Sequence, residues 1–383
     1  MNKHSLVAAA PIPFIDLEAQ RTRLGARIDD AVARVLNHCQ FIMGPEVRTL
    51  EADLAQFCGV KEVISCANGT DALALVLMAK GLKAGDAVFC PSFTFAATAE
   101  VVAWFGATPI LVDVHSETFN MSAASLEAGV AKAKQLGLRP AAVMPVDLFG
   151  QPADYAAIEP ICAAHGLWML CDAAQSFGAT YKGRKVGTFG LATGTSFYPP
   201  KPLGCYGDGG AIFTDDSALA EIIRSLRIHG HGAHAYDHVR IGMNGRFDTI
   251  QAAILIEKLK IFPDEIARRN AIAARYSAAL ADVAIVPNIR PDCTSVWAQY
   301  TIRVEAGRRD GFAAALKTQG IPTAIHYPKP VHQQPAYRHF PTAGNGLPVS
   351  EELAREVISL PMHPYLETGV QDRIIDAVRR ALV

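Results

Sequence analysis

The sequence of 383 residues lacks three features that would each place a protein in a well-defined class. It has no run of about 18 apolar residues, which a membrane-spanning helix requires. Neither sign of charge is in excess, since 36 Lys and Arg stand against 37 Asp and Glu, so nothing indicates the basic surface that binds nucleic acid. Its eight cysteines form no CxxC pair and no zinc-type spacing. We therefore expect a cytoplasmic protein with reduced, buried thiols and no membrane, nucleic-acid or metal partner.

The composition that remains is that of a globular protein, with 50% hydrophobic and 19% charged residues. Residues 1–12 are expected to form a loose leader, because their apolar core is too short for a signal peptide. Neither internal repeats nor low-complexity segments follow. A chain of this length is expected to form two domains rather than one core.

Short apolar strands alternate with helical segments over most of the chain. We expect strands at 62–66, 86–90, 108–113, 140–146, 167–171, 193–198 and 210–214, with helices between several of them. The alternation predicts an α/β fold whose mostly parallel sheet is covered by helices on both faces. Beyond residue 250 come two longer amphipathic helices, 251–260 and 264–281, and a strand at 298–302. This change predicts a large domain of residues 1–250 and a smaller α+β domain of residues 251–383.

One lysine, Lys201, lies in an unusually stiff stretch, between Pro199-Pro200 and Pro202. Each proline fixes its own φ and biases the preceding residue toward extended backbone, so Lys201 is unlike a helical lysine. Glycines follow at 204, 207, 209 and 210 and permit close backbone approach. A Schiff-base lysine needs such a fixed position. Taken alone, the stretch is better explained by a solvated lysine in a surface loop, because lysines near glycines are common.

A carboxylate at a strand end favours the Schiff-base interpretation. Asp172 ends the apolar strand that contains Leu170 and Cys171, and Gln175 follows three residues later. A carboxylate in that place is costly unless it caps a helix or faces a cation. A pyridoxal phosphate (PLP) site supplies such a cation, the protonated ring nitrogen, together with a lysine partner.

Two turns after strands suit ligand binding. The run Ala67-Asn68-Gly69-Thr70-Asp71 joins a strand to a helix, and a helix N-terminus favours a phosphate. The alternative there is an ordinary cap made by Thr70 or Asp71. The second turn, at 91–95, carries Phe95, which either fills the core or stacks on a planar cofactor.

The histidine-rich run at 229–240 invites a metal-site interpretation. It contains neither a cysteine nor the i, i+4 histidine pair of a helical site, and its glycines make it flexible, so we expect no metal there.

Six motifs together resemble the DegT-type sugar-nucleotide aminotransferases, from Phe14 to about residue 365. They are Asn68-Gly69-Thr70-Asp71-Ala72-Leu73, Phe93-Thr94-Phe95, Asp172-Ala173-Ala174-Gln175, Ser196-Phe197-Tyr198-Pro199-Pro200-Lys201, Gly207-Asp208-Gly209-Gly210 and Asn244-Gly245-Arg246-Phe247-Asp248. The resemblance implies the aspartate aminotransferase-like architecture (fold type I) with a seven-stranded-type sheet, PLP as cofactor, and a homodimer. Dehydratases of the family have histidine in place of the lysine, so Lys201 favours transamination.

The resemblance also implies a role for each matched residue. Lys201 would bind PLP covalently and move the proton, and Asp172 would pair with the ring N–H. Gln175 would contact the ring hydroxyl, and Phe95 would stack on the ring. The phosphate would be held by Gly69, Thr70 and Ser196, with Asn244 reaching over from the other subunit of a shared active site.

Within the family, four runs are most similar to aminotransferases that act on UDP-2-acetamido-2-deoxy-3-oxo-glucuronate in O-antigen synthesis, with L-glutamate as the donor. These runs are 65–70, 201–206, 323–328 and 360–365. A uronate carboxylate requires a guanidinium, and Arg246 is the candidate. His326 and Tyr327 are candidates for sugar or phosphate contacts, with a structural role at the dimer interface as the alternative for all three residues.

Three other functions stay open at this point. The first is amination of another 3-keto or 4-keto UDP-, dTDP- or GDP-sugar, and the second is a non-catalytic sensor with the same fold. The third, an NAD or ATP enzyme using the glycines at 204–210, fits neither known phosphate-loop spacing, and the segment leads into a strand.

Overall fold

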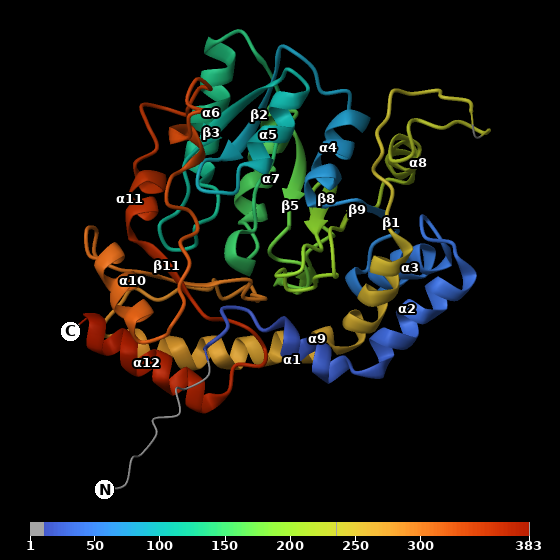
Figure 1. Ribbon diagram of the computed structural model, residues 1–383. Helices are drawn as coiled ribbons and strands as arrows, with labels where there is room; N and C mark the ends of the chain where they lie inside the picture. The colour runs from blue at the N-terminus through green and yellow to red at the C-terminus, as the bar shows by residue number, and fades with distance from the viewer. Residues whose placement is uncertain (1–10, 235, 383) are drawn as a thin grey trace, which may run out of the picture.

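The computed structural model describes residues 11–234 and 236–382. Residues 1–10 of the expected leader lie outside this range, as does Ala235 within the histidine-rich run. Figure 1 shows a central sheet with helices packed around it and one long helix, α9, running beneath it toward the C-terminal unit.

The central sheet has seven strands in the order β1-β9-β8-β5-β4-β2-β3. β9 is antiparallel to both of its neighbours, and the other adjacent pairs are parallel. The strands are β1 (Glu62–Cys66), β2 (Asp86–Pro91), β3 (Thr108–Val112), β4 (Arg139–Val143), β5 (Trp168–Asp172), β8 (Ala192–Ser196) and β9 (Gly210–Thr214). This confirms the predicted α/β fold with a mostly parallel sheet.

Alternation of side chains gives the sheet two apolar faces. On β1 and β9, Ile64 and Ile212 pack with α4 (Gly69–Ala79) and α8 (Ser217–Leu226). On the opposite face of the same strands, Val63 and Phe213 pack with α3 and α9. The other helices that cover the sheet are α3 (Pro45–Cys58), α5 (Ala97–Trp104), α6 (Ala123–Gln135) and α7 (Tyr155–His165). Helices cover both faces of the sheet, as is usual for a mostly parallel sheet, because the connections between parallel strands place helices on its faces.

Helix α9 (Thr249–Leu280) corrects the sequence prediction of two helices, because it continues through Pro263. A proline inside a helix removes one backbone hydrogen bond. Here Leu255 and Phe262 are fully buried against the sheet, which holds the helix in place on the N-terminal side of the proline. Tertiary packing therefore overrides the local break. Near the N-terminus, α1 (Leu17–Leu24) and α2 (Ala26–His38) are separated at Gly25, which adopts a positive φ of 53°.

The second half of α9 forms a core with the C-terminal unit. Ile272 and Tyr276 pack against the antiparallel pair β10 (Tyr300–Arg303) and β11 (Val357–Leu360). The helices of this unit are α10 (Arg309–Thr318), α11 (Pro348–Glu356) and α12 (Thr368–Leu382). Short elements complete the fold: β6 (Thr180–Tyr181), β7 (Arg184–Lys185) and the 3-10 turns η1 (Leu148–Gly150) and η2 (Val331–Gln333). The domain boundary near residue 250 stays a proposal, since α9 crosses from one core to the other.

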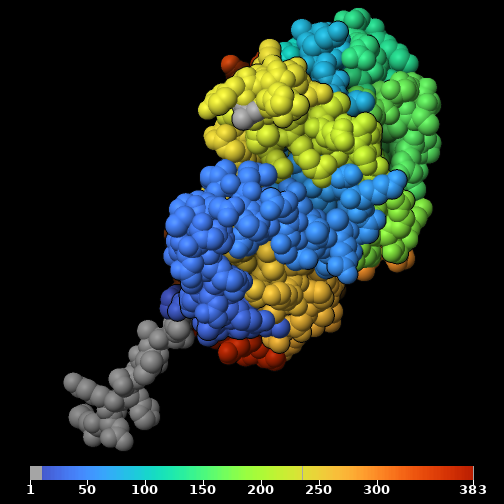
Figure 2. Space-filling view, turned by 90° about the vertical axis from the view of Figure 1, so that its right-hand side faces the viewer, coloured from blue at the N-terminus to red at the C-terminus, as the bar shows by residue number. Residues whose placement is uncertain are grey.

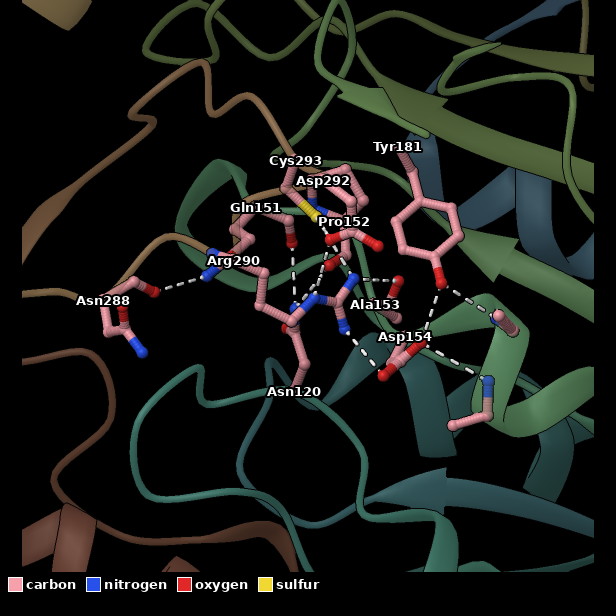
Figure 3. Close-up of polar contacts among 12 residues, drawn as sticks. Asn120, Gln151, Pro152, Ala153, Asp154, Tyr181, Asn288, Arg290, Asp292 and Cys293 are labelled. Atoms are coloured by element: carbon pink, nitrogen blue, oxygen red, sulfur yellow. Dashed lines mark hydrogen bonds and ion pairs between the residues drawn. The ribbon is translucent and has the colours of Figure 1, made fainter. Parts of the chain in front are cut away.

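A polar cluster fixes the segment after α9 onto the large sheet (Figure 3). Arg290 donates from Nη2 to the Ala153 carbonyl at 3.2 Å and pairs with Asp154 at 3.3 Å. Gln151 accepts from the Arg290 backbone N–H at 2.8 Å and donates to the Asn288 carbonyl at 3.0 Å. The segment that follows α9 is thereby held against residues 151–154, which join η1 to α7.

Across the described residues, no helix is sufficiently long and apolar for a membrane crossing. All eight cysteines fall within this part of the chain and are unpaired.

Candidate active site

A cavity of about 850 Å³ lies at the carboxyl ends of β1, β5 and β8, where open α/β sheets bind ligands. It brings together most of the residues predicted from the sequence, namely Gly69, Thr70, Phe95, Asp172, Gln175, Ser196, Lys201, His326 and Tyr327. The last two come from the C-terminal unit, so both parts of the chain contribute. Asn244 and Arg246 do not line the cavity of their own chain.

The first turn of α4 forms a narrow cradle against the end of β8. A Cβ on Gly69 would lie 2.6 Å from the Ser196 Cβ, so only glycine permits this approach. Gly210 at the start of β9 pairs with Cys66 on one side and Ser196 on the other, which brings the two strand ends together. The backbone N–H groups of this turn and the N-terminus of α4 favour an anion between them.

The cap of α4 differs from the predicted alternative. Asn68, rather than Thr70 or Asp71, is the N-cap residue, and its Oδ1 accepts from the Asp71 N–H at 2.8 Å. The Thr70 hydroxyl is therefore not needed for capping, and Thr70 lines the cavity.

Asp172 and Lys201 carry opposite charges that face this cavity. Burial raises the pKa of Asp172, which is 6% exposed, while hydrogen bonds and the Lys201 charge oppose the rise. Burial lowers the pKa of the Lys201 amine, and Asp172 opposes that change in turn. A lysine of lowered pKa is more often uncharged at neutral pH than an ordinary lysine, and the uncharged amine is the nucleophile that forms a Schiff base.

Two donors hold the Asp172 carboxylate, and sequence reasoning missed one of them. The fully buried Thr98 donates from Oγ1 to Asp172 Oδ2 at 2.9 Å, and the Ala174 N–H donates to Oδ1 at 3.2 Å. Thr98 lies in α5, one turn after Phe95, so its distance from Asp172 in the sequence concealed the contact. The sequence signal that could have indicated Thr98 is its position just after the 91–95 turn, which was predicted to bind a ligand.

Gln175 and Tyr327 link the two parts of the chain. The Gln175 Oε1 accepts from the Phe149 N–H at 2.7 Å, and its Nε2 donates to the Tyr327 hydroxyl at 3.4 Å. The Phe95 ring is 60% exposed and lies 6.3 Å from the Tyr327 ring, whereas Phe93 is fully buried. Of the two phenylalanines in the turn, Phe95 is thus free to stack on a planar ligand.

His326 also faces the cavity from the C-terminal unit. Its Nδ1 lies 3.3 Å from the Ser359 hydroxyl of β11. Burial lowers the pKa of the imidazole, and the Lys201 charge lowers it further. The ring is therefore neutral near pH 7, and it offers one hydrogen-bond donor and one acceptor.

Comparison with known proteins assigns this site to a family. The model of the DegT/DnrJ/EryC1/StrS aminotransferase family matches residues 22–379, nearly the whole chain. The chain belongs to this family.

Individual relatives match this chain along nearly their whole length. A UDP-2-acetamido-2-deoxy-3-oxo-D-glucuronate aminotransferase of Pseudomonas aeruginosa is 49% identical over 359 residues, covering 94% of this chain and 97% of the relative. A dTDP-3-amino-3,4,6-trideoxy-alpha-D-glucose transaminase of Streptomyces venezuelae is 40% identical, covering 96% and 95%. The crystal structure of a DegT/DnrJ/EryC1/StrS aminotransferase from Brucella abortus superposes with a TM-score of 0.95 at 51% identity, covering 97% and 99%.

The chain is therefore a PLP-dependent aminotransferase acting on keto nucleotide sugars, with the fold type I architecture. Its residues fit PLP on structural grounds. The Gly69–Ser196 cradle suits a phosphate because a side chain at 69 would fill it. The buried Asp172 suits a protonated ring nitrogen, and Lys201 supplies an amine of lowered pKa within the same cavity.

The two remaining motif residues of this aminotransferase lie outside its own cavity. The backbone of Asn244 pairs with Ile228, and the next residue, Gly245, accepts from the Ala67 N–H at 3.2 Å. Asn244 is exposed and Arg246 is half-buried. Within the described residues, neither side chain makes a hydrogen bond or ion pair.

For residues 11–234 and 236–382, no group of three or more His, Cys, Asp or Glu side chains is arranged to hold a metal ion. In the histidine-rich run, the rings of His231 and His238 lie 4.9 Å apart with no third ligand of this kind in the described chain.

Proposed function

We propose that this enzyme transfers an amino group from L-glutamate to C3 of UDP-2-acetamido-2-deoxy-3-oxo-D-glucuronate. The product would enter the synthesis of a bacterial surface polysaccharide such as an O-antigen, and the enzyme would work in the cytoplasm. The observation that carries the substrate assignment is the 49% identity, over nearly the full length of both chains, to the Pseudomonas enzyme of that name.

The cavity residues receive the following roles in this proposal. PLP, when bound, supplies an electron sink for the carbon that loses a proton. Lys201 Nζ would hold the cofactor and would carry the proton that the sugar carbon gains. Asp172 accepts a hydrogen bond from the ring N–H, and Thr98 keeps that carboxylate oriented.

Binding and orientation fall to the remaining residues. Gly69, Thr70 and Ser196 would hold the phosphate at the N-terminus of α4, and the exposed Phe95 side chain would cover the cofactor ring. Gln175 would contact the ring hydroxyl through Nε2. That atom now donates to the Tyr327 hydroxyl at 3.4 Å, a weak hydrogen bond that it would give up or share.

A homodimer with shared active sites completes the proposal. Several large apolar side chains of the α2–α3 region and of the segment after Ala235 are exposed; they are Leu36, Phe41, Ile42, Tyr236, Val239 and Ile241. Figure 2 shows the α2–α3 region (blue) and the yellow part of the chain on one face of the molecule. Tyr236 and Ile241 are 95% and 93% exposed, which is costly for an isolated chain. A second copy on this face would cover them and bring Asn244 to the partner's phosphate.

Substrate recognition is assigned to three residues. Arg246 would read the C6 carboxylate, because a guanidinium matches a carboxylate in geometry and charge. His326 and Tyr327 would contact the sugar or its phosphate from the C-terminal unit, where both line the cavity. For these three residues, a structural role at the dimer interface is the competing interpretation.

The deciding experiment is a substrate panel with the purified PLP-loaded enzyme and L-glutamate. It contains 3-keto and 4-keto UDP-, dTDP- and GDP-sugars, with and without a C6 carboxylate, and aminated products are identified by mass spectrometry. We expect the UDP-linked 3-keto uronate to give the highest kcat/KM. A higher value for a dTDP-linked sugar would instead favour the activity named for the Streptomyces relative.

A further inference from the structure

A second lysine, Lys258 of α9, lies directly beneath the loop that carries Lys201. Its side chain is fully buried, and Nζ donates to the Gly204 carbonyl at 2.6 Å. The same ammonium lies 4.1 Å from the ring centroid of Tyr206. Only a short stretch of loop therefore separates Lys201 from the carbonyl that Lys258 binds. The roles proposed above for the cavity residues do not involve Lys258.

The carbonyl that Lys258 holds is at the tightest point of the loop. Gly204 packs against the backbone of Tyr198 and Pro199, where a Cβ would overlap the Pro199 carbonyl. The Lys201 N–H donates to the Tyr198 carbonyl at 2.8 Å. Fixing Gly204 therefore fixes the residues on both sides of Lys201, because the two limbs of the loop touch each other here.

A second side chain of α9 holds the same limb two helical turns earlier. Gln251 Oε1 accepts from the Tyr206 N–H at 2.8 Å, and its Nε2 donates to the Tyr206 carbonyl at 3.4 Å. Residues at i and i+7 lie on one face of a helix. Gln251 and Lys258 together form what we term the α9 clasp.

Burying an ammonium is costly, which makes Lys258 an unusual choice for a residue that only fills space. Its surroundings carry three further titratable groups: the Cys205 thiol, the Tyr206 hydroxyl and Glu265, two turns later on the same face of α9. Burial lowers the pKa of Lys258 to about 8, against a raising effect of Cys205 and Glu265. A methionine of similar length would avoid this cost but leave the Gly204 carbonyl without a donor.

We propose that the α9 clasp, and Lys258 in particular, positions the Lys201 amine for bond formation with the cofactor and for proton transfer. This rests on the proposed role of Lys201. Lys258 is a positioning residue, since it touches the loop and not the reacting atoms. The rate of a positioned reaction falls by about 10²-fold when the reacting group is misplaced by about 1 Å.

The test compares Lys258→Met with Lys260→Met in the full-length enzyme. Lys260 lies on the same helix but is 56% exposed at its side chain and pairs with Glu257 at 2.8 Å. Apoenzyme is mixed with PLP, samples are reduced with borohydride at intervals, and the modified peptide is identified and quantified by mass spectrometry. Steady-state kcat and the KM for the keto sugar are measured separately, with thermal unfolding of each apoenzyme.

We expect Lys258→Met to slow fixation of PLP on Lys201 by at least about tenfold and to lower kcat by roughly 10²-fold, with KM within a few-fold of wild type. Lys260→Met should match wild type. A Lys258→Met variant that unfolds at lower temperature yet fixes PLP at the wild-type rate would overturn the proposal, since its role would then be structural.

A second variant keeps the test decisive where Lys258→Met does not fold. Gln251 is only half-buried, so Gln251→Leu should fold, and we expect it to slow PLP fixation several-fold; fixation at the control rate would contradict the clasp. Label found on a lysine other than Lys201 in the wild-type enzyme would refute the proposed role of Lys201 itself. Slow PLP fixation in the variants alone, with the label on Lys201, supports both the role of Lys201 and the positioning role of the α9 clasp.

Discussion

The Thr98 hydroxyl donates to Oδ2 of Asp172 at 2.9 Å inside a fully buried environment. Burial raises the pKa of that carboxyl group, and the Thr98 hydrogen bond opposes the rise by stabilising the ionised form. Thr98 thus helps to keep Asp172 charged, and a charged Asp172 is what a protonated cofactor ring nitrogen requires.

Replacing Thr98 with valine should weaken the enzyme without unfolding it. The variant keeps the shape of the side chain but removes one hydrogen bond to a charged group, which is worth about 1.5–3 kcal/mol. We expect kcat to fall by about tenfold or more and the dissociation constant of PLP to rise. Fluorescence titration of the apoenzyme with PLP checks the second effect, and unchanged PLP binding would count against a role for Thr98 toward Asp172.

Lys201→Ala should abolish turnover and leave the fold intact. It removes covalent catalysis together with acid–base catalysis, and the latter alone contributes about 10²–10⁴-fold. Steady-state transamination measures the loss, and circular dichroism of the apoenzyme provides the folding control. Activity at even a tenth of the wild-type rate would exclude Lys201 as the catalytic lysine.

Mixed dimers should reveal the proposed sharing of active sites. Asn244→Ala and Lys201→Ala subunits are each expected to be impaired alone. After subunit exchange, a heterodimer contains one site with both residues and one with neither, so activity should recover toward half that of a wild-type dimer. Exchange confirmed by differently tagged subunits, without recovery, would mean that Asn244 serves its own chain or none.

Arg246→Ala should discriminate between substrates. If the guanidinium reads a C6 carboxylate, its loss leaves that charge unpaired at a cost of several kcal/mol, so kcat/KM for the uronate falls steeply. An analogue with CH₂OH at C6 should be affected much less. Equal losses for the two sugars would instead indicate that Arg246 only maintains the loop.

Lys258 should make the stability of the apoenzyme depend on alkaline pH. Its pKa is about 8 in the folded chain against about 10.4 when unfolded, so the unfolded chain binds more protons between these values. The free energy of unfolding therefore rises with pH across this window, by on the order of 3 kcal/mol in total from this group.

The measurement is a urea titration of wild type, Lys258→Met and Lys260→Met between pH 7.5 and 10. The stability of wild type relative to Lys258→Met should increase with pH, while the Lys260→Met variant serves as the control. Burial raises the pKa of the facing Cys205 thiol to about 11, against about 8.5 in an unfolded chain, so this group lowers stability as pH rises through the window. Cys205 is present in all three proteins, so the comparison between them isolates Lys258. A constant difference between wild type and Lys258→Met would show that the buried amine titrates normally.

Much of the fold could be predicted because it follows from local pattern. Apolar strands followed by small polar turns and helices specify a parallel sheet, and the predicted strands match those of the structure within a few residues. The helix α6 was not predicted, and α9 was divided at Pro263. In the second case the deciding contacts, such as Phe262 against the sheet, are long-range and leave no mark on local periodicity.

The site could be predicted where chemistry is concentrated in short motifs. Lys201, Asp172 and the Gly69 turn were found from proline, carboxylate and glycine placement, and the structure brings all three to one cavity. Thr98 and Lys258 were missed, because a threonine or lysine in a helix looks ordinary until the loop or strand it contacts is known. The roles of Asn244 and Arg246 depend on a second chain and stay predictions.

The antiparallel placement of β9 bears on the order in which the protein matures. Gly210 joins the end of β1, which leads into the Gly69 turn, to the end of β8. The chain reaches β9 long after β1. Such distant pairings form late, because the intervening chain must be closed first. We expect PLP binding to require the completed pairing at Gly210, so added cofactor should stabilise the folded enzyme without speeding its folding.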